Sequence, residues 1–358
     1  MTTNAFPESP VDFGMFDWVE YNWDDPGASL EHRLRMAEVA DKGGFYGWHI
    51  AEHHGSKICL NISPGVLLSA AIQRTKRIRI GSLNYCLPWH NPYRLYNEIC
   101  ELDQLSRGRF DLGMGRGSIL ESGMIWGIKD EAESRGRYRE TVDILLNAFQ
   151  NPVLNFTGTY FNYQDIDLLN APYQRPYPPL WFPSSNPHTE EFLGPHGYNV
   201  AFNSAPPDQI RQQCERYRGL WVQHQNDPGR HNAHVAAPKL AIRPHILVTE
   251  RDGEAMDLLR PAHEIWASHI SYFQTRHGIV QRAGGVDRGL DFAIAQGLVF
   301  AGTPESVRQQ MAESLKATTA NYILGAFSFG DLRPEYAERS ATLFAEEVMP
   351  AFKKAVPA

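Results

Sequence analysis

Short β-rich runs alternate with amphipathic helical stretches along most of the chain, and this alternation constrains the fold more than any other feature of the sequence. Strands that alternate with helices imply a parallel sheet with right-handed crossovers. Eight such runs select a closed barrel over an open, doubly wound sheet. The sequence therefore predicts an α/β protein, a (β/α)8 TIM barrel with insertions. The expected strands are residues 11–16, 46–51, 78–84, 109–114, 179–184, 198–202, 240–249 and 322–327.

The expected helices carry recognisable signals at their ends. In the first one, apolar residues from Leu30 to Ala40 recur at helical spacing. Ser29 is its expected N-cap, and Gly43-Gly44 is its expected stop, because glycine tolerates the left-handed conformation at a helix end. The helices are expected at residues 29–41, 64–73, 92–105, 134–149, 188–193, 207–225, 253–273, 303–317 and 334–348.

The length of the chain fits one domain, residues 1–358, because a barrel needs about 250 residues and tolerates insertions. Two segments are additional to the eight strand–helix units of the barrel. Residues 151–170 contain two β-rich runs on either side of Gly158, which predicts a hairpin insertion. Residues 274–302 are rich in glycine, and long loops of this kind are either lids or static surface excursions. The sequence leaves both readings of this lid-like insertion open.

Composition excludes several classes of protein. The formal charge is −7, from 34 basic and 41 acidic side chains, and no basic patch of the kind that binds nucleic acid is present. No run of about 18 apolar residues could cross a membrane, and residues 1–10 lack the apolar core of a secretory signal. The four cysteines are scattered without a C-x-x-C pair, which is typical of reduced thiols. We therefore expect a cytoplasmic protein.

Polar residues cluster directly after four successive predicted strands. In a TIM barrel, function resides in the loops that follow the C-terminal ends of the strands, so these side chains should meet on one face. The segments are Glu52-His53-His54, then Asn84-Tyr85 with His90, then Gly115-Arg116-Gly117-Ser118, and finally Ser185, Asn186, His188 and Thr189.

The paired histidines suggest acid–base chemistry more than metal binding. His53 and His54 are adjacent, so they would point in opposite directions along an extended chain, and no third ligand stands at a recognisable spacing. We therefore expect no metal site. Imidazole changes its charge near neutral pH, which makes His53 a candidate general base. A structural, hydrogen-bonded histidine is the alternative.

The glycines around Arg116 are suited to a phosphate. Residues 113–117 lack the third glycine of a dinucleotide-binding motif, and no helix is expected to open directly there. Glycines let backbone N–H groups approach a phosphate closely, and Arg116 adds a planar fork of donors. Arg135 is either a second positive charge for this site or a solvated helix residue. Residues 185–189 lead into a helix N-terminus, which predicts an anion site or simple helix capping.

Together these segments resemble the bacterial luciferase-like flavin monooxygenases, from Phe13 to Pro350. The most specific pieces stand in the order and spacing of that family. They are Ala51-Glu52-His53-His54, Leu105-Ser106-Arg107-Gly108-Arg109-Phe110 followed by Gly115-Arg116-Gly117, and Gly302-Thr303-Pro304.

The resemblance implies a role for each candidate site residue. His53 matches the active-site base of luciferase. Arg116 and Arg135 match arginines that hold the FMN phosphate. Leu83-Asn84 matches a non-proline cis peptide under the isoalloxazine ring. The segment that contacts the phosphate and the ring system corresponds to Ser185, Asn186 and Thr189.

The implied reaction uses reduced FMN and O2 to oxidise a small, apolar organic substrate through a flavin C4a-(hydro)peroxide. A separate flavin reductase would supply the reduced FMN, and members of this family are often dimers, so a homodimer is expected. Two alternatives remain: hydride transfer with a deazaflavin coenzyme, and a non-catalytic partner subunit of a luciferase-like heterodimer. His53, Arg116 and Arg135 argue against the second.

Two departures from luciferase bear on the substrate. Gly115 replaces a reactive cysteine, and Ser185 replaces an acidic residue. Light emission is therefore not implied, and the expected substrate is something other than a long-chain aldehyde. Trp18, Trp89 and Trp126 lie in or near the strand-end loops, which fits an apolar or aromatic substrate, although core packing is the commoner role of tryptophan.

Overall fold

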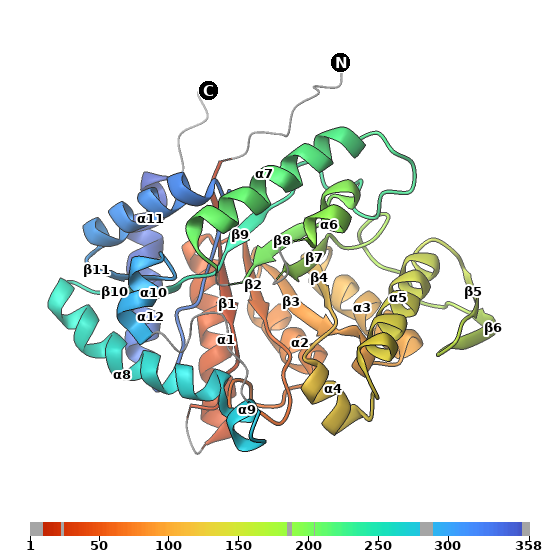
Figure 1. Ribbon diagram of the computed structural model, residues 1–358, viewed down its shortest axis with the longest axis horizontal. Helices are drawn as coiled ribbons and strands as arrows, with labels where there is room; N and C mark the ends of the chain where they lie inside the picture. The colour runs from red at the N-terminus through yellow and green to blue at the C-terminus, as the bar shows by residue number, and fades with distance from the viewer. Residues whose placement is uncertain (1–9, 23–24, 185–187, 204, 280–288, 353–358) are drawn as a thin grey trace.

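A closed barrel of eight parallel strands forms the centre of the protein, and helices surround it (Figure 1). The computed structural model describes residues 10–22, 25–184, 188–203, 205–279 and 289–352. Each predicted strand supplies one barrel strand, so the predicted TIM barrel is confirmed. Around the barrel the order is β1 (Asp12–Asp17), β12 (Tyr322–Gly325), β9 (Leu240–Ile242), β8 (Asn199–Phe202), β7 (Leu180–Ser184), β4 (Phe110–Gly115), β3 (Arg79–Cys86) and β2 (Gly47–Ile50).

Most of the outer helices begin with proline in the first turn, where its missing N–H costs nothing. The first helix starts earlier than predicted, because Asp25 rather than Ser29 caps it and accepts a hydrogen bond from the N–H of Ala28 at 3.0 Å. Gly44, at φ 73°, ends it as predicted. The outer helices are α1 (Pro26–Gly43), α2 (Pro64–Arg74), α3 (Pro92–Ser106), α5 (Glu131–Ala148), α6 (Glu190–His196), α7 (Pro207–His224), α8 (Asp252–Ile270), α11 (Pro304–Thr318) and α12 (Pro334–Leu343).

The predicted strand 240–249 is wrong as a single element. The barrel strand β9 ends at Ile242, and the chain leaves the barrel at Arg243-Pro244, where proline has no N–H to continue a ladder. The following strand β10 (His245–Val248) pairs in parallel with β11 (Val299–Gly302) instead. The end of the predicted lid-like insertion is therefore a strand. This insertion also includes part of α9 (Tyr272–Arg276) and all of α10 (Gly289–Ala295), and its residues 280–288 lie outside the described residues.

A hairpin and a short helix also lie between β4 and β7. In the segment where the sequence suggested a hairpin, β5 (Val153–Thr157) and β6 (Asn162–Asp167) pair in antiparallel fashion. The helix α4 (Ile119–Trp126) was not predicted. It opens directly after the glycine-rich segment, where Ser118 caps it by accepting a hydrogen bond from the N–H of Glu121. The expectation that no helix opens there is wrong, and α4 brings a carboxylate to the barrel mouth.

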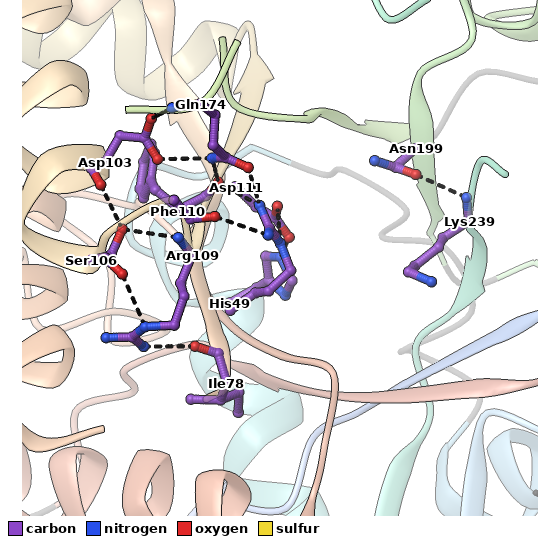
Figure 2. A network of polar contacts seen from close by, with 12 residues as sticks. His49, Ile78, Asp103, Ser106, Arg109, Phe110, Asp111, Gln174, Asn199 and Lys239 are labelled. Atoms are coloured by element: carbon purple, nitrogen blue, oxygen red, sulfur yellow. Dashed lines mark hydrogen bonds and ion pairs between the residues drawn. The ribbon is translucent and has the colours of Figure 1, made fainter. Parts of the chain in front are cut away.

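A polar network ties the strands together at their N-terminal ends (Figure 2). The Oδ1 atom of Asp111 accepts a hydrogen bond from Arg79 Nε at 2.7 Å, and its Oδ2 atom lies 3.3 Å from His49 Nε2. Gln174 joins the network by donating to Asp103 Oδ1 at 2.8 Å and accepting from Arg79. These residues lie at the end of the barrel that usually serves stability.

Candidate active site

The C-terminal ends of β3 and β4 form the floor of the candidate site. The peptide bond between Leu83 and Asn84 is cis, as predicted. Beside it, Gly115 is paired with Cys86, and a Cβ atom added at Gly115 would lie only 2.4 Å from Nδ2 of Asn84. A side chain at position 115 would therefore require the Asn84 side chain to move. Leu83 itself is buried inside the barrel in a cluster with Phe16 and Ala51.

His53 follows β2 and is held by a buried carboxylate. Its Nδ1 atom lies 3.1 Å from Oε1 of Glu121, whose other oxygen accepts a hydrogen bond from the N–H of His54 at 3.1 Å. Glu121 is only 4% exposed, whereas the side chain of His53 keeps 28% of its surface accessible. Burial alone would lower the pKa of His53, but the negative charges of Glu121 and Glu52 raise it. His53 and Glu121 are thus arranged like a general base and the carboxylate that orients it.

The sequence analysis missed Glu121, although a signal was present. Ser118 and Glu121 have the S-x-x-E spacing that marks a helix start. That pattern would have predicted α4, and it would have placed a carboxylate one helical turn from the glycine-rich segment around Arg116. No local feature, however, shows that this carboxylate reaches back to the loop after β2.

A second buried carboxylate, Glu52, fixes the loops after β2 and β3 relative to each other. It accepts hydrogen bonds from the N–H of Cys86 at 2.7 Å and from His90 Nε2 at 3.0 Å, and it lies 3.4 Å from His54 Nε2. Burial would raise the pKa of Glu52, but these partners outweigh it and lower the value to about 2. The same interaction raises the pKa of His90 against the effect of its burial. Glu52 thus stays charged and holds the floor of the site rigid.

Two predicted phosphate-binding arginines meet on one acidic oxygen. Oε2 of Glu131 lies 3.3 Å from Arg116 Nη1 and 2.5 Å from Arg135 Nη2. Burial slightly opposes ionisation of Glu131, but the two guanidinium groups lower its pKa. The arginines come from different elements, the loop after β4 and the helix α5. Their convergence shows that this part of the site can bind an anionic oxygen with two positive charges.

Tyr138 adds a donor to the same place. It lies three residues after Arg135, on the same side of α5. Its ring packs edge-on against Phe182 of β7, with 6.3 Å between the ring centroids. The buried hydroxyl has no hydrogen-bond partner among the described residues. Burial raises the pKa of Tyr138, and the nearby charge of Arg116 opposes that rise. The sequence analysis missed this hydroxyl because its burial depends on the packing of α5 against β7.

The remaining predicted residues follow β7. Thr189 directly precedes α6, and no described contact joins its side chain to Arg116 or Arg135. Ser185 and Asn186 lie outside the described residues. Because β2, β3, β4 and β7 are neighbours in the barrel, the described candidates come from the C-terminal ends of four adjacent strands, apart from Arg135, which lies on α5.

Aromatic rings surround the two histidines. The ring of Trp18 lies 5.9 Å from that of His53. Trp89 and Trp126 stack on each other at 5.7 Å, and both lie edge-on to His54. Trp126 remains 40% exposed, so these rings are not simply core. They give the mouth of the barrel an apolar wall.

Among the described residues, no group of three or more histidine, cysteine, aspartate or glutamate side chains is arranged to bind a metal ion. None of the described helices combines the length and the apolar character needed to cross a membrane.

The sequence matches the family model of the luciferase-like monooxygenases over residues 11–322. A relative in Sinorhizobium fredii, an uncharacterised protein, is 32% identical over 95% of this chain and 97% of its own length. The oxygenase component of a flavin-dependent trigonelline monooxygenase from Acinetobacter baylyi is 25% identical over 90% of both chains. The alkanal monooxygenase alpha chain of Photobacterium leiognathi is 25% identical over 93% of this chain and 97% of its own.

Solved structures show the same fold at lower sequence identity. A monooxygenase from Streptomyces bottropensis superposes with a TM-score of 0.82 at 23% identity, over 95% of this chain and 99% of that chain. The oxygenating constituent of 3,6-diketocamphane monooxygenase from Pseudomonas putida, in complex with FMN, has a TM-score of 0.78 at 19% identity over 95% and 98%. A coenzyme F420-dependent reductase from Methanopyrus kandleri has a TM-score of 0.70 at 19% identity over 96% and 100%.

Proposed function

The chain belongs to the luciferase-like monooxygenase family, and from this premise we propose that it oxidises a small, apolar or aromatic substrate with reduced FMN and O2. One observation carries the proposal. Arg116, Leu83-Asn84 and the carboxylate-bound His53 lie at the C-terminal ends of the neighbouring strands β4, β3 and β2, and Arg135 of α5 shares one acidic oxygen with Arg116. FMN carries an anionic phosphate at one end and a planar ring system at the other, so it needs an anion site and a surface for the ring.

The residues present fit FMN. Its phosphate would be held by Arg116 and Arg135 in place of the Glu131 carboxylate, with the unbonded hydroxyl of Tyr138 as a further donor. Thr189, and by family resemblance Ser185 and Asn186, would complete this end. The ring system would lie over Leu83-Asn84. Reduced FMN, when bound, supplies the two electrons that activate O2.

His53 is the group that we expect to hold or move a proton. Glu121 binds Nδ1, and no described residue bonds Nε2, so that atom can accept or donate a proton. Glu121 also stabilises the positive charge that His53 acquires when it takes a proton. The apolar wall of Trp18, Trp89 and Trp126 would exclude water from the reacting atoms.

We further propose that a separate reductase supplies the reduced FMN. The trigonelline relative is the oxygenase component of its system, which supports this division of labour. The alternative coenzyme is a deazaflavin such as the F420 used by the Methanopyrus kandleri reductase. The same experiment separates the two coenzymes.

The test begins with anaerobic titration of the purified protein with reduced FMN and with reduced F420. The proposal expects FMN to bind more tightly. Oxygen is then added, and a transient absorption band at about 370–380 nm should form and decay to the spectrum of oxidised FMN. Absence of FMN binding would overturn the proposal, and so would FMN binding without a transient. Preferential binding of F420 would replace it with hydride transfer.

A further inference from the structure

Arg243 is a positive charge at the barrel mouth that neither the sequence analysis nor the proposed chemistry uses. It directly follows β9, which lies opposite β3 in the barrel. Its guanidinium carbon lies 4.7 Å from the ring centroid of Phe16 and 5.2 Å from that of Trp18. Its Nη2 atom donates a hydrogen bond to Oδ1 of Asn203, which follows β8. Arg243 therefore sits across the barrel from the floor where the flavin ring is proposed.

The charge of Arg243 has no acidic partner among the described residues. Arg33 of α1, which is buried, pairs with Asp17 at 3.6 Å, and Arg79 of β3, which is partly buried, pairs with Asp111 at 2.7 Å. The Nε atom of Arg243 is buried and lacks any acceptor in the described part of the chain. The surrounding protein lowers the pKa of Arg243 to about 10, so the group remains charged at pH 7. A charge that is partly withdrawn from water and has no counter-charge is costly, which points to a ligand that supplies the missing anion.

Arg243 also stands next to the candidate base. Trp18 contacts both side chains, because its ring lies 5.9 Å from the ring of His53. The charge of Arg243 acts on His53 and opposes the rise in pKa that Glu121 causes. The side chain of Arg243 is only half-buried, so it keeps surface that a small molecule can reach. An anion bound there would lie beside His53 with its carbon skeleton against Trp18.

On the basis of the proposed function, we propose that Arg243 binds the acid group of the substrate, and that the substrate is an organic carboxylate with an apolar or aromatic body. When the face of a guanidinium packs on aromatic rings, its N–H groups point outward in the plane of the group and can donate hydrogen bonds to a carboxylate. Phe16 and Trp18 fix the orientation of that edge, and Asn203 restrains it further. The substrate would then be recognised by its charge at Arg243 and by its shape at the tryptophans.

Benzoate and benzamide form a matched pair of probes, because they share the aromatic body and differ in charge. Binding is measured on the protein loaded with oxidised FMN, from the change in the flavin spectrum and the quenching of tryptophan fluorescence. Wild-type protein should bind benzoate at least about tenfold more tightly than benzamide, since a hydrogen bond to a charged group contributes about 1.5–3 kcal/mol. Equal binding of the two probes would overturn the proposal.

The variant Arg243→Met removes the charge at similar length and should weaken benzoate binding about tenfold or more, without changing benzamide or FMN binding. Arg243→Lys should retain part of the benzoate affinity. Arg251→Met is the control, because Arg251 is 80% exposed on the outer surface. Unchanged benzoate binding in Arg243→Met would contradict the proposal. Equal loss of FMN affinity would instead assign the charge to the cofactor.

Failure of this inference can be told apart from failure of the proposed function. If the protein binds FMN and gives the transient but prefers neither probe, only the carboxylate assignment is wrong. If it does not bind FMN, the proposed function is wrong whatever the probes do. If Arg243→Met does not fold, the comparison of benzoate with benzamide on wild-type protein still decides the point.

Discussion

At the N-terminal end of the barrel strands, Asp111 is matched by both Arg79 and His49, whereas at the C-terminal mouth Arg243 has no carboxylate among the described residues. Buried carboxylates at both ends find partners within the chain, Asp111 at the N-terminal end and Glu52 and Glu121 at the mouth, and the unpaired charge of Arg243 sets it apart from them. Figure 2 shows how Gln174 and Asp103 extend that network. Groups that lack a partner are the ones a ligand can use, so the difference separates the stabilising end from the reactive end.

The mouth itself is not uniform. On the side of β2 and β3, buried carboxylates hold the histidines of the strand-end loops: Glu52 binds His90 and lies 3.4 Å from His54, and Glu121 binds Nδ1 of His53. On the sides of β7 and β9, the hydroxyl of Tyr138 and Nε of Arg243 lack partners in the described part of the chain. The first region positions catalytic groups, and the second is left open for the phosphate and the substrate.

Replacing His53 should have the largest effect on catalysis. His53→Ala removes the proposed proton-handling group, and turnover should fall by about 10²–10⁴-fold. The free energy of unfolding should change little, because the side chain is 28% exposed and has one polar partner. Turnover is measured under saturating reduced FMN, and stability is measured by urea denaturation. His224→Ala, at the end of α7, is the matched control. Full activity in His53→Ala would show that His53 is structural.

Replacing Asp111 should have the largest effect on stability. Asp111→Ala removes the buried ion-pair partner of the partly buried Arg79, and the free energy of unfolding should fall by about 3–5 kcal/mol. Burial opposes ionisation of Asp111, but Arg79 and His49 lower its pKa. The stabilisation is therefore complete above the ordinary value of 3.8 and disappears as the pH falls through the lowered value. Urea denaturation at several pH values measures both effects.

The exposed Asp331 provides the control for this experiment, since Asp331→Ala should change the free energy of unfolding by about 0.5 kcal/mol or less. The surviving folded fraction of Asp111→Ala should bind FMN with wild-type affinity. If that variant instead loses FMN binding while remaining as stable as wild type, the division between the two ends of the barrel is wrong.

Replacing Glu121 tests whether it positions His53. Glu121→Gln keeps the shape of the side chain but removes the charge that raises the pKa of His53. A base works in its neutral form, so wild-type activity falls as the pH drops below the raised pKa. In Glu121→Gln the pH at which activity falls on the acidic side of the pH–activity profile should be lower. Maximal turnover should drop by about 10–100-fold. If Glu121 has only a structural role, Glu121→Gln should change the free energy of unfolding and leave the acidic side of the pH–activity profile where it is.

The sequence predicted the barrel well, because each strand run is apolar and a helical stretch follows it. It missed the break in residues 240–249, since Pro244 interrupts a run that remains apolar on both sides. It singled out Leu83-Asn84 through resemblance alone, and Arg116 and Arg135 first from their place at a glycine-rich loop and a helix start and then through resemblance. Arg243 escaped notice because an unpaired charge is a property of the packed structure. The segment Leu105–Phe110, which supported the resemblance, contains Ser106 and Arg109 of the N-terminal polar network and thus reflects stability.

The smallest predicted effect concerns Glu131, which in this structure takes the place proposed for the FMN phosphate. Because it competes with the phosphate for Arg116 and Arg135, Glu131→Gln should tighten FMN binding by a few-fold, in line with the roughly 0.2–1 kcal/mol of an exposed ion pair. The same change should cost a few tenths of a kcal/mol of stability, about 0.3, by removing a negative charge from the first turn of α5.

Arg116→Ala is the opposing variant, and it should weaken FMN binding by about tenfold or more, because it removes a charge-assisted contact to the phosphate. Titration with FMN and with riboflavin, which lacks the phosphate, separates the phosphate contribution from that of the ring. Both variants should leave riboflavin affinity unchanged. Weaker FMN binding in Glu131→Gln would mean that the carboxylate does not compete with the phosphate but holds the two arginines in place for it. The phosphate site would then already be organised before FMN binds.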